Sequence, residues 1–164
     1  MACSCRKLSN ASSPANFLFI FVSVSPGAIT LTGMSAGNNV TISMGTGTGE
    51  LTLASAMVLG GVTIDASTFG GALDIGTITA SGAAVISTGT AGDLSATEIH
   101  TTGLITIDAA AATTAAMSVG VLSASGVVTV ALGSGGGDFD VTESIISNKS
   151  VVFDGTNSTG TVTF

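Results

Sequence analysis

Basic residues are almost missing from this sequence. Arg6, Lys7 and Lys149 are the only three among 164 residues, against ten acidic residues, and the formal net charge is −7. A surface that binds nucleic acid needs clustered cations to displace counterions from phosphate, and anionic lipid headgroups attract the same kind of surface. Nucleic acid and acidic membrane surfaces are therefore excluded as partners.

Tryptophan and tyrosine are absent, and His100 is the only histidine. The chain therefore lacks the aromatic platform on which sugar rings stack. The two cysteines, Cys3 and Cys5, both lie at the very start of the chain, so they form neither a disulfide framework nor a cysteine–histidine metal site. No phosphate-binding loop or nucleophile–base set occurs. These absences predict a protein that is not an enzyme and has no cofactor.

Charged residues make up only 8% of the chain, whereas hydrophobic residues make up 45% and glycine contributes 23 residues. Disordered chains combine low hydrophobicity with high charge, which is the opposite composition. Leu, Glu, Lys and Arg, on which helices depend, are scarce. Small and β-branched residues separated by glycine predict short strands and tight turns, in one domain with a real core.

The N-terminal segment, residues 1–26, differs from the rest. Arg6 and Lys7 precede an apolar run, Phe17 to Val22, and Ser23 and Ser25 offer small residues at a spacing that signal peptidase accepts. Residues 1–26 therefore fit either a cleaved secretory signal or an apolar N-terminal cap. The run is too short to span a bilayer, so we expect no membrane insertion of the mature chain. Residues 27–164 form the repeat domain.

A short apolar–polar–apolar triplet, such as "VTI" at Val62, returns about every eleven residues from Ala28 onward. Nine of the twelve intervals are eleven residues, and glycine stands two places before the triplet in ten of thirteen cases. Such a regular repeat is stronger evidence for the fold than the secondary-structure propensity of any single segment. The triplets begin at Ile29, Val40, Leu51, Val62, Leu73, Ala84, Leu94, Ile105, Met117, Val128, Phe139, Val151 and Val162.

Each triplet predicts a short strand with its two apolar residues buried and its central residue outward. The preceding glycine, or Asn38, is expected to supply the positive φ of a sharp corner. A second, weaker strand is expected five to seven residues into each repeat. Its apolar residues are Met34, Val58, Phe69, Ile78, Ile99, Leu122 and Ile145.

Three folds have this period. A right-handed helical coil also repeats every eleven residues, but one glycine per repeat would cost it about 1 kcal/mol each. A β-sandwich accommodates strands at this spacing but does not require equal intervals. A parallel β-solenoid requires both equal intervals and repeated residue types, because each coil stacks on the one below. We therefore predict an all-β parallel β-solenoid with two eleven-residue repeats in each coil and six coils, and keep the β-sandwich as the alternative.

Threonine occupies the central, outward position in seven triplets. A regular hydroxyl face of this kind resembles that of ice-binding solenoids, although their doubled Thr-x-Thr rows do not occur here in one repeat phase. The alternative is that threonine simply suits an exposed strand and pairs with threonine on adjacent coils. The ladder consists of Thr30, Thr41, Thr52, Thr63, Thr106, Thr129 and Thr163.

Aspartates recur at the predicted corners. Asp138 and Asp140 flank Phe139 after "GSGGG" and are the candidate ligands for Ca²⁺, which prefers oxygen. The calcium nonapeptide is not matched, so solvated corner carboxylates are the alternative. Glu98 and His100 would share a strand face and are the one acid–base pair available, too few for a metal site. A carbohydrate-active enzyme therefore ranks last among the hypotheses.

From Gly27 to Phe164 the Gly/Thr/Ser/Ala-rich repeats resemble those of bacterial surface adhesins, autotransporter passengers and phage tail-fibre or other virion proteins. The resemblance implies a structural fibre section located outside the cell, on its surface or on a virion. Because "GTVTF" stops within a triplet without a polar cap, the chain is expected either to belong to something longer or to stack end to end. We expect a non-catalytic fibre protein that self-associates, or alternatively a binding module for ice, calcium or glycan.

Overall fold

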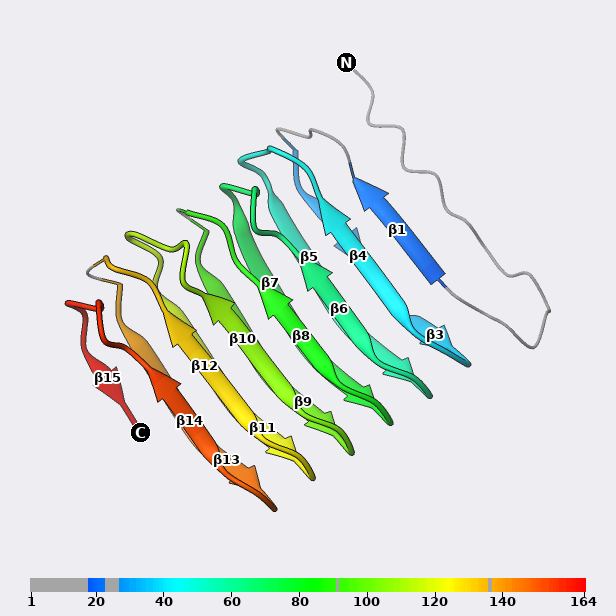
Figure 1. Ribbon diagram of the computed structural model, residues 1–164. Coiled ribbons are helices and arrows are strands. Elements are labelled where there is room, and N and C mark those ends of the chain that lie inside the picture. Colours follow the sequence, from blue (N-terminus) through cyan, green and yellow to red (C-terminus); the bar gives the residue numbers. More distant parts are fainter. Residues whose placement is uncertain (1–17, 23–26, 91, 136) are drawn as a thin grey trace.

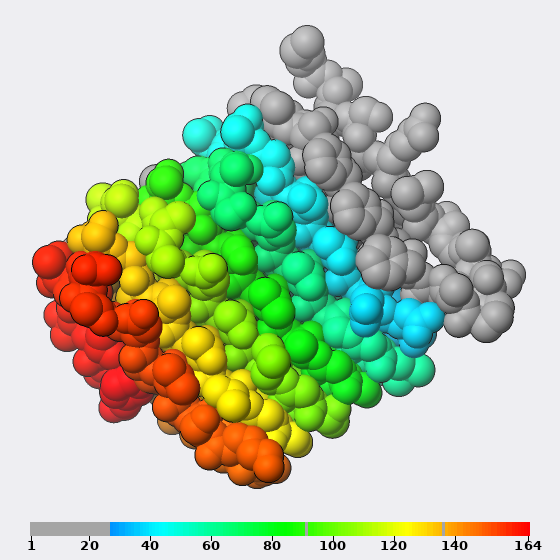
Figure 2. Space-filling view, in the orientation of Figure 1, coloured from blue at the N-terminus to red at the C-terminus, as the bar shows by residue number. Residues whose placement is uncertain are grey.

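A computed structural model describes residues 18–22, 27–90, 92–135 and 137–164, with side chains from residue 27 onward. Its strands wind in one direction as a rod, with β1 and β15 at opposite ends (Figure 1). The described residues contain no helix, and hence no helix that could span a membrane. Each turn forms one band across the surface of the rod (Figure 2).

The strands belong to two parallel sheets, here called sheet A and sheet B, that face each other across the core. Sheet A contains β1 (Leu18–Val22), β4 (Val40–Met44), β6 (Val62–Asp65), β8 (Ala84–Ser87), β10 (Ile105–Ala109), β12 (Val128–Leu132) and β14 (Val151–Asp154). Sheet B contains β2 (Ile29–Leu31), β3 (Met34–Ala36), β5 (Glu50–Val58), β7 (Ala72–Ala80), β9 (Leu94–Thr101), β11 (Met117–Ala124), β13 (Phe139–Ser147) and β15 (Val162–Thr163).

Every paired strand is parallel to its neighbour, and the first residues of the triplets lie in register. In sheet A, Val62 pairs with Val40 on one side and Ala84 on the other, so each triplet pairs with the next but one along the chain. The predicted β-solenoid, in which one coil holds two of the eleven-residue repeats, is therefore confirmed. A β-sandwich does not account for these strands because its sheets are antiparallel.

The core consists of aliphatic columns, one residue per turn. Ile42, Ile64, Ile86 and Ile107 stack in sheet A, and each is fully buried. Leu and Ile from sheet B fill the opposite side. Full burial of one such side chain contributes about 1.5–3 kcal/mol, so the columns supply the main stabilisation.

The two halves of a turn are not equivalent, contrary to the eleven-residue unit expected from the sequence. In sheet B the triplet and the weaker apolar position form one long strand, as in β7, where Leu73 and Ile78 are both buried. After a sheet A triplet the chain turns instead, and Phe69 is buried in that turn rather than in a strand. The structural repeat is therefore one full turn, which contains two different triplets.

The corner glycines are required for close approach, not for positive φ as expected. The backbone φ lies outside the left-handed region at each of the following glycines two places before a triplet: Gly49, Gly60, Gly71, Gly82, Gly92, Gly103, Gly126 and Gly137. Gly60, Gly82, Gly103 and Gly126 lie on one another in successive turns, and the backbone N–H of each of the last three donates to the carbonyl of the one before. A Cβ at Gly82 or Gly103 would meet the backbone of the turn below.

At the N-terminal end, β1 pairs with β4 from Leu18↔Val40 to Val22↔Met44, which extends sheet A by one strand. Leu18 thus takes the register position that the first residue of a triplet takes in the other strands of sheet A. Cleavage of residues 1–26 stays a prediction, and Cys3 and Cys5 lie outside the described residues.

We predict that Gly71→Ala lowers the free energy of unfolding by about 2 kcal/mol, or Tm by roughly 6 °C for a domain of this size. The new methyl would meet the Gly49 carbonyl and the Phe69 ring. Gly37→Ala is the matched control, because a Cβ there meets nothing within 4 Å. Thermal unfolding followed by circular dichroism measures both, and equal Tm values would contradict the close-approach explanation.

Candidate functional site

The predicted threonine ladder is divided between the two outer faces. Thr41, Thr63, Thr106 and Thr129 belong to one column of sheet A, which Val85 interrupts and Val152 ends. Thr30, Thr52 and Thr163 belong to sheet B, where Asp74, Ser95, Ser118 and Asp140 complete the column. None of these threonines is buried, so the outward orientation of the central residue holds. Ice binding by this ladder stays a prediction.

A second outward column on sheet A carries three of the aspartates. It contains Ser43, Asp65, Ser87, Asp108, Ala131 and Asp154 in successive turns. The aspartates thus lie two turns apart, about 10 Å at the spacing of stacked strands.

These aspartates close the corners that follow the sheet A strands. Asp65 Oδ1 accepts hydrogen bonds from the Ser67 backbone and hydroxyl, and Asp108 Oδ1 accepts one from the Ala110 N–H. At Asp154 the hydroxyl of Thr156, and then its backbone N–H, lower the pKa of the carboxyl. Because the folded-state pKa is lowered, the stabilisation at this corner is present at neutral pH and is lost as the pH falls through that pKa.

A shallow depression lies beside Asp65 and Asp108. Its one exceptional member is Thr88, which is 2% exposed and whose Oγ1 has no hydrogen-bond partner. Thr88 occupies an inward position, next along the chain after outward Ser87. The depression is lined by Thr63, Asp65, Ser67, Ser87, Thr88, Asp108, Ala110 and Ala111.

The two candidate calcium ligands make different contacts, and calcium binding by them stays a prediction. Asp138 precedes β13, and its Oδ1 accepts a hydrogen bond of 2.8 Å from the Thr161 N–H, one turn ahead. Asp140 lies on the outer face of β13, in register with Thr163. Among the described residues, no group of three or more His, Cys, Asp or Glu side chains is placed to hold a metal ion.

The Asp138 contact belongs to a recurring device that sequence reasoning missed. Asp93 Oδ1 accepts a hydrogen bond from Ala116 N–H, and Asn39 Oδ1 accepts one from Gly61 N–H. Each donor lies one turn ahead, directly before the next triplet of the same sheet. The signal in the sequence is an Asp or Asn immediately before a triplet, one place after the position that is usually glycine.

Glu98 and His100 share a face of β9, as predicted, with Oε2 and Nε2 3.3 Å apart. Both side chains are more than 40% exposed to solvent. Their neighbours in register are Thr77 and Thr79 on one side and Val121 and Ser123 on the other. The described contacts therefore add no third titratable partner to this pair.

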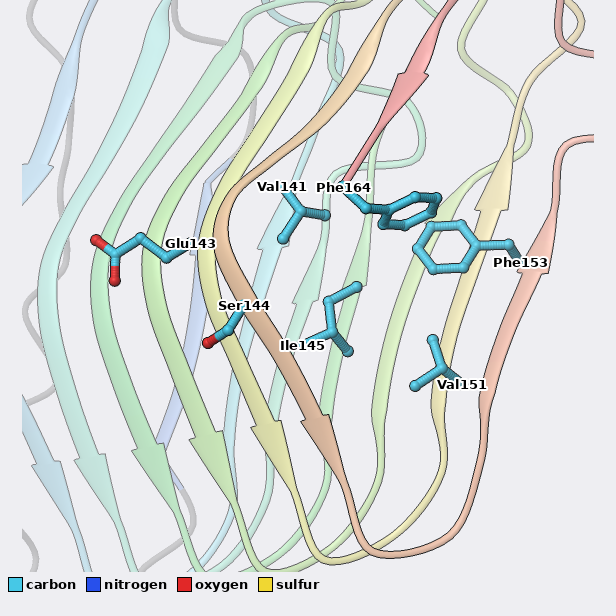
Figure 3. Close-up of a pocket in the computed structure, with 7 residues that line it drawn as sticks. All are labelled: Val141, Glu143, Ser144, Ile145, Val151, Phe153 and Phe164. Carbon is cyan, nitrogen blue, oxygen red and sulfur yellow. The ribbon is translucent and has the colours of Figure 1, made fainter.

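The C-terminal end carries an apolar groove of about 510 Å³. The rings of Phe139, Phe153 and Phe164 form an edge-to-face row, with centroids 5.4 and 4.7 Å apart. Phe164 is 72% exposed, and the carboxylate of Glu143 points away from the rings (Figure 3). The groove is lined by Val141, Glu143, Ser144, Ile145, Val151, Phe153 and Phe164.

Comparison of the chain with protein-family models, with curated proteins and with solved structures found no match.

We predict that Asp138→Ala makes the Thr161 amide hydrogen exchange about five-fold faster, because it loses an acceptor worth about 1 kcal/mol. Asp138→Asn keeps an amide oxygen in that place and leaves the exchange rate unchanged. Amide exchange followed by NMR measures both. A rise in Tm on adding Ca²⁺ that Asp138→Asn abolishes would instead establish Asp138 as a calcium ligand.

We predict that Thr88→Val raises the free energy of unfolding by about 1 kcal/mol, because it removes a buried hydroxyl without a partner at nearly constant shape. Thr101→Val is the control and lowers stability. The Thr101 hydroxyl donates to the Gly103 carbonyl at 3.2 Å. Urea unfolding measures both variants, and a destabilised Thr88→Val would contradict the assignment of an unsatisfied hydroxyl.

Proposed function

We propose that this protein is a non-catalytic structural repeat protein that forms part of a fibre by self-association. The observation that carries the proposal is an apolar groove beside β14 and β15, which have no further neighbour among the described strands. Among the described strands, β1 and β14 end sheet A, while β2 and β15 end sheet B. An open strand edge is a template for further pairing.

Among the side chains that the structure describes, from residue 27 onward, apolar exposure is greatest in the last part of the chain. Five of the eight exposed large hydrophobic side chains in these residues lie there, and they are Ile146, Val151, Val152, Val162 and Phe164. Exposed apolar surface next to unpaired backbone favours association. This surface supports a structural role more than a catalytic one, because its exposed side chains are aliphatic and aromatic, like those that fill the core.

We propose where the protein is located from the families that its repeats resemble. Gly/Thr/Ser-rich β-solenoids of surface adhesins, autotransporter passengers and phage tail fibres suggest a fibre outside the cell, on the cell surface or on a virion. A contact between two different surfaces of the same protein generates open filaments rather than closed dimers. A rod with two different ends fits that mode of growth.

We predict that the purified chain forms elongated particles whose length increases with concentration. Phe164→Ser raises the concentration needed for assembly at least tenfold, because burying this ring contributes about 2 kcal/mol. Leu59→Ser is the matched control, since Leu59 is 71% exposed and lies away from the ends of the rod. Electron microscopy and sedimentation velocity measure assembly, and dispersed monomers at high concentration would contradict the proposal.

A further inference from the structure

We propose that Glu98 and His100 form one half of a zinc site, and that a second copy of this chain supplies the other half. One Zn²⁺ then joins two rods side by side, bound by Oε2 of Glu98 and Nε2 of His100 from each copy. This inference goes beyond the proposed function, because the contact lies on the side of the rod and does not depend on how fibres grow.

The distance between the two ligand atoms carries the inference. Oε2 of Glu98 and Nε2 of His100 are 3.3 Å apart. In tetrahedral sites Zn²⁺ lies about 2.0–2.1 Å from a histidine nitrogen and about 2.0–2.2 Å from a carboxylate oxygen. Two ligand atoms at those bond lengths are about 3.4 Å apart. The observed separation is therefore already that of two ligands of one zinc ion.

Strand β9 presents both side chains on one outer face of the rod. Residues two apart in a strand share a face, and Ile99 between them is fully buried, which directs the pair outward. β9 pairs with β7 and with β11, and at least two strands of sheet B lie on each side of it (Figure 1). The pair is thus held by the middle of the sheet, with 45% of the Glu98 side chain and 42% of the His100 side chain exposed.

One chain offers two ligands here, whereas a structural zinc site is almost always four-coordinate. The in-register neighbours of the pair are Thr77 and Thr79 on β7 and Val121 and Ser123 on β11, and none of these is titratable. His100 is the only histidine in the sequence. A second copy, related by a two-fold axis through the metal, supplies the same pair again and completes the site.

The surface around the pair allows a second copy to come close. The four neighbouring outward positions carry only threonine, valine and serine, so no long side chain stands between the two sheets. Each copy brings one carboxylate, and the two negative charges match the charge of one Zn²⁺. Without the metal these carboxylates would repel each other, in a chain whose net charge is already −7. The contact is therefore expected to form with zinc and to separate without it.

The test is sedimentation velocity on the full chain with Cys3 and Cys5 replaced by serine, because thiolates bind zinc themselves. The protein concentration is kept below that at which fibres form. Adding one Zn²⁺ per two chains is expected to convert monomers into dimers, and adding a chelator is expected to reverse the change.

His100→Ala and Glu98→Gln are each expected to weaken zinc binding about tenfold or more in titration calorimetry, because each alters two of the four ligands. Asp74→Asn is the matched control. Asp74 is an exposed carboxylate on the neighbouring strand β7, but it lies in register with Ser95 rather than with the pair. Its substitution is expected to leave zinc binding and dimer formation unchanged.

Binding of one Zn²⁺ per monomer, without dimers, would overturn the role of the second copy. The absence of zinc binding, or zinc-dependent dimers that persist in His100→Ala, would overturn the site. These results are separate from those that test the proposed function. Fibres that form in the presence of a chelator would leave that function in place even if the zinc site failed, and zinc-dependent dimers that never grow into fibres would support the site while contradicting that function.

Discussion

The whole structure depends on in-register parallel pairing between successive turns, each of which contains two triplets. This pairing brings like residues together, so that Ile42, Ile64 and Ile86 form one buried column. It also brings the corner glycines together, with hydrogen bonds such as that between Gly103 N–H and the Gly82 carbonyl. A shift by one residue would turn every aliphatic side chain outward, which is why the register is so strongly specified.

Much of this fold was predictable, because successive turns of a solenoid need the same residue types at the same positions, and the sequence therefore repeats at a fixed interval. The triplets that begin at Val40 and Leu51 alternate strictly between the two sheets, and their central threonines face outward as expected. The inequality of the two half-turns was not predictable. Phe69 and Ile78 occupy similar phases, yet one is buried in a turn and the other in a strand, because the long strand of sheet B has no counterpart in sheet A.

The candidate sites show where sequence reasoning reaches its limit. The pairing of Glu98 with His100 follows from strand alternation alone, and the structure places them 3.3 Å apart. The contact of Asp138 with Thr161 joins adjacent turns and needs the register across a whole turn, as does the close approach of the glycines, whose φ was wrongly expected to be positive. Regularity along the chain thus predicts columns well, but it does not predict which polar group bridges two turns.

A density map of the protein at side-chain resolution, from crystallography or cryo-electron microscopy, tests the central claim most directly. The account predicts that Ile64, Ile86 and Ile107 lie one above the other in parallel strands about 4.8 Å apart, inside a common core. Antiparallel neighbours, or a register displaced by one residue so that these isoleucines face solvent, would contradict it.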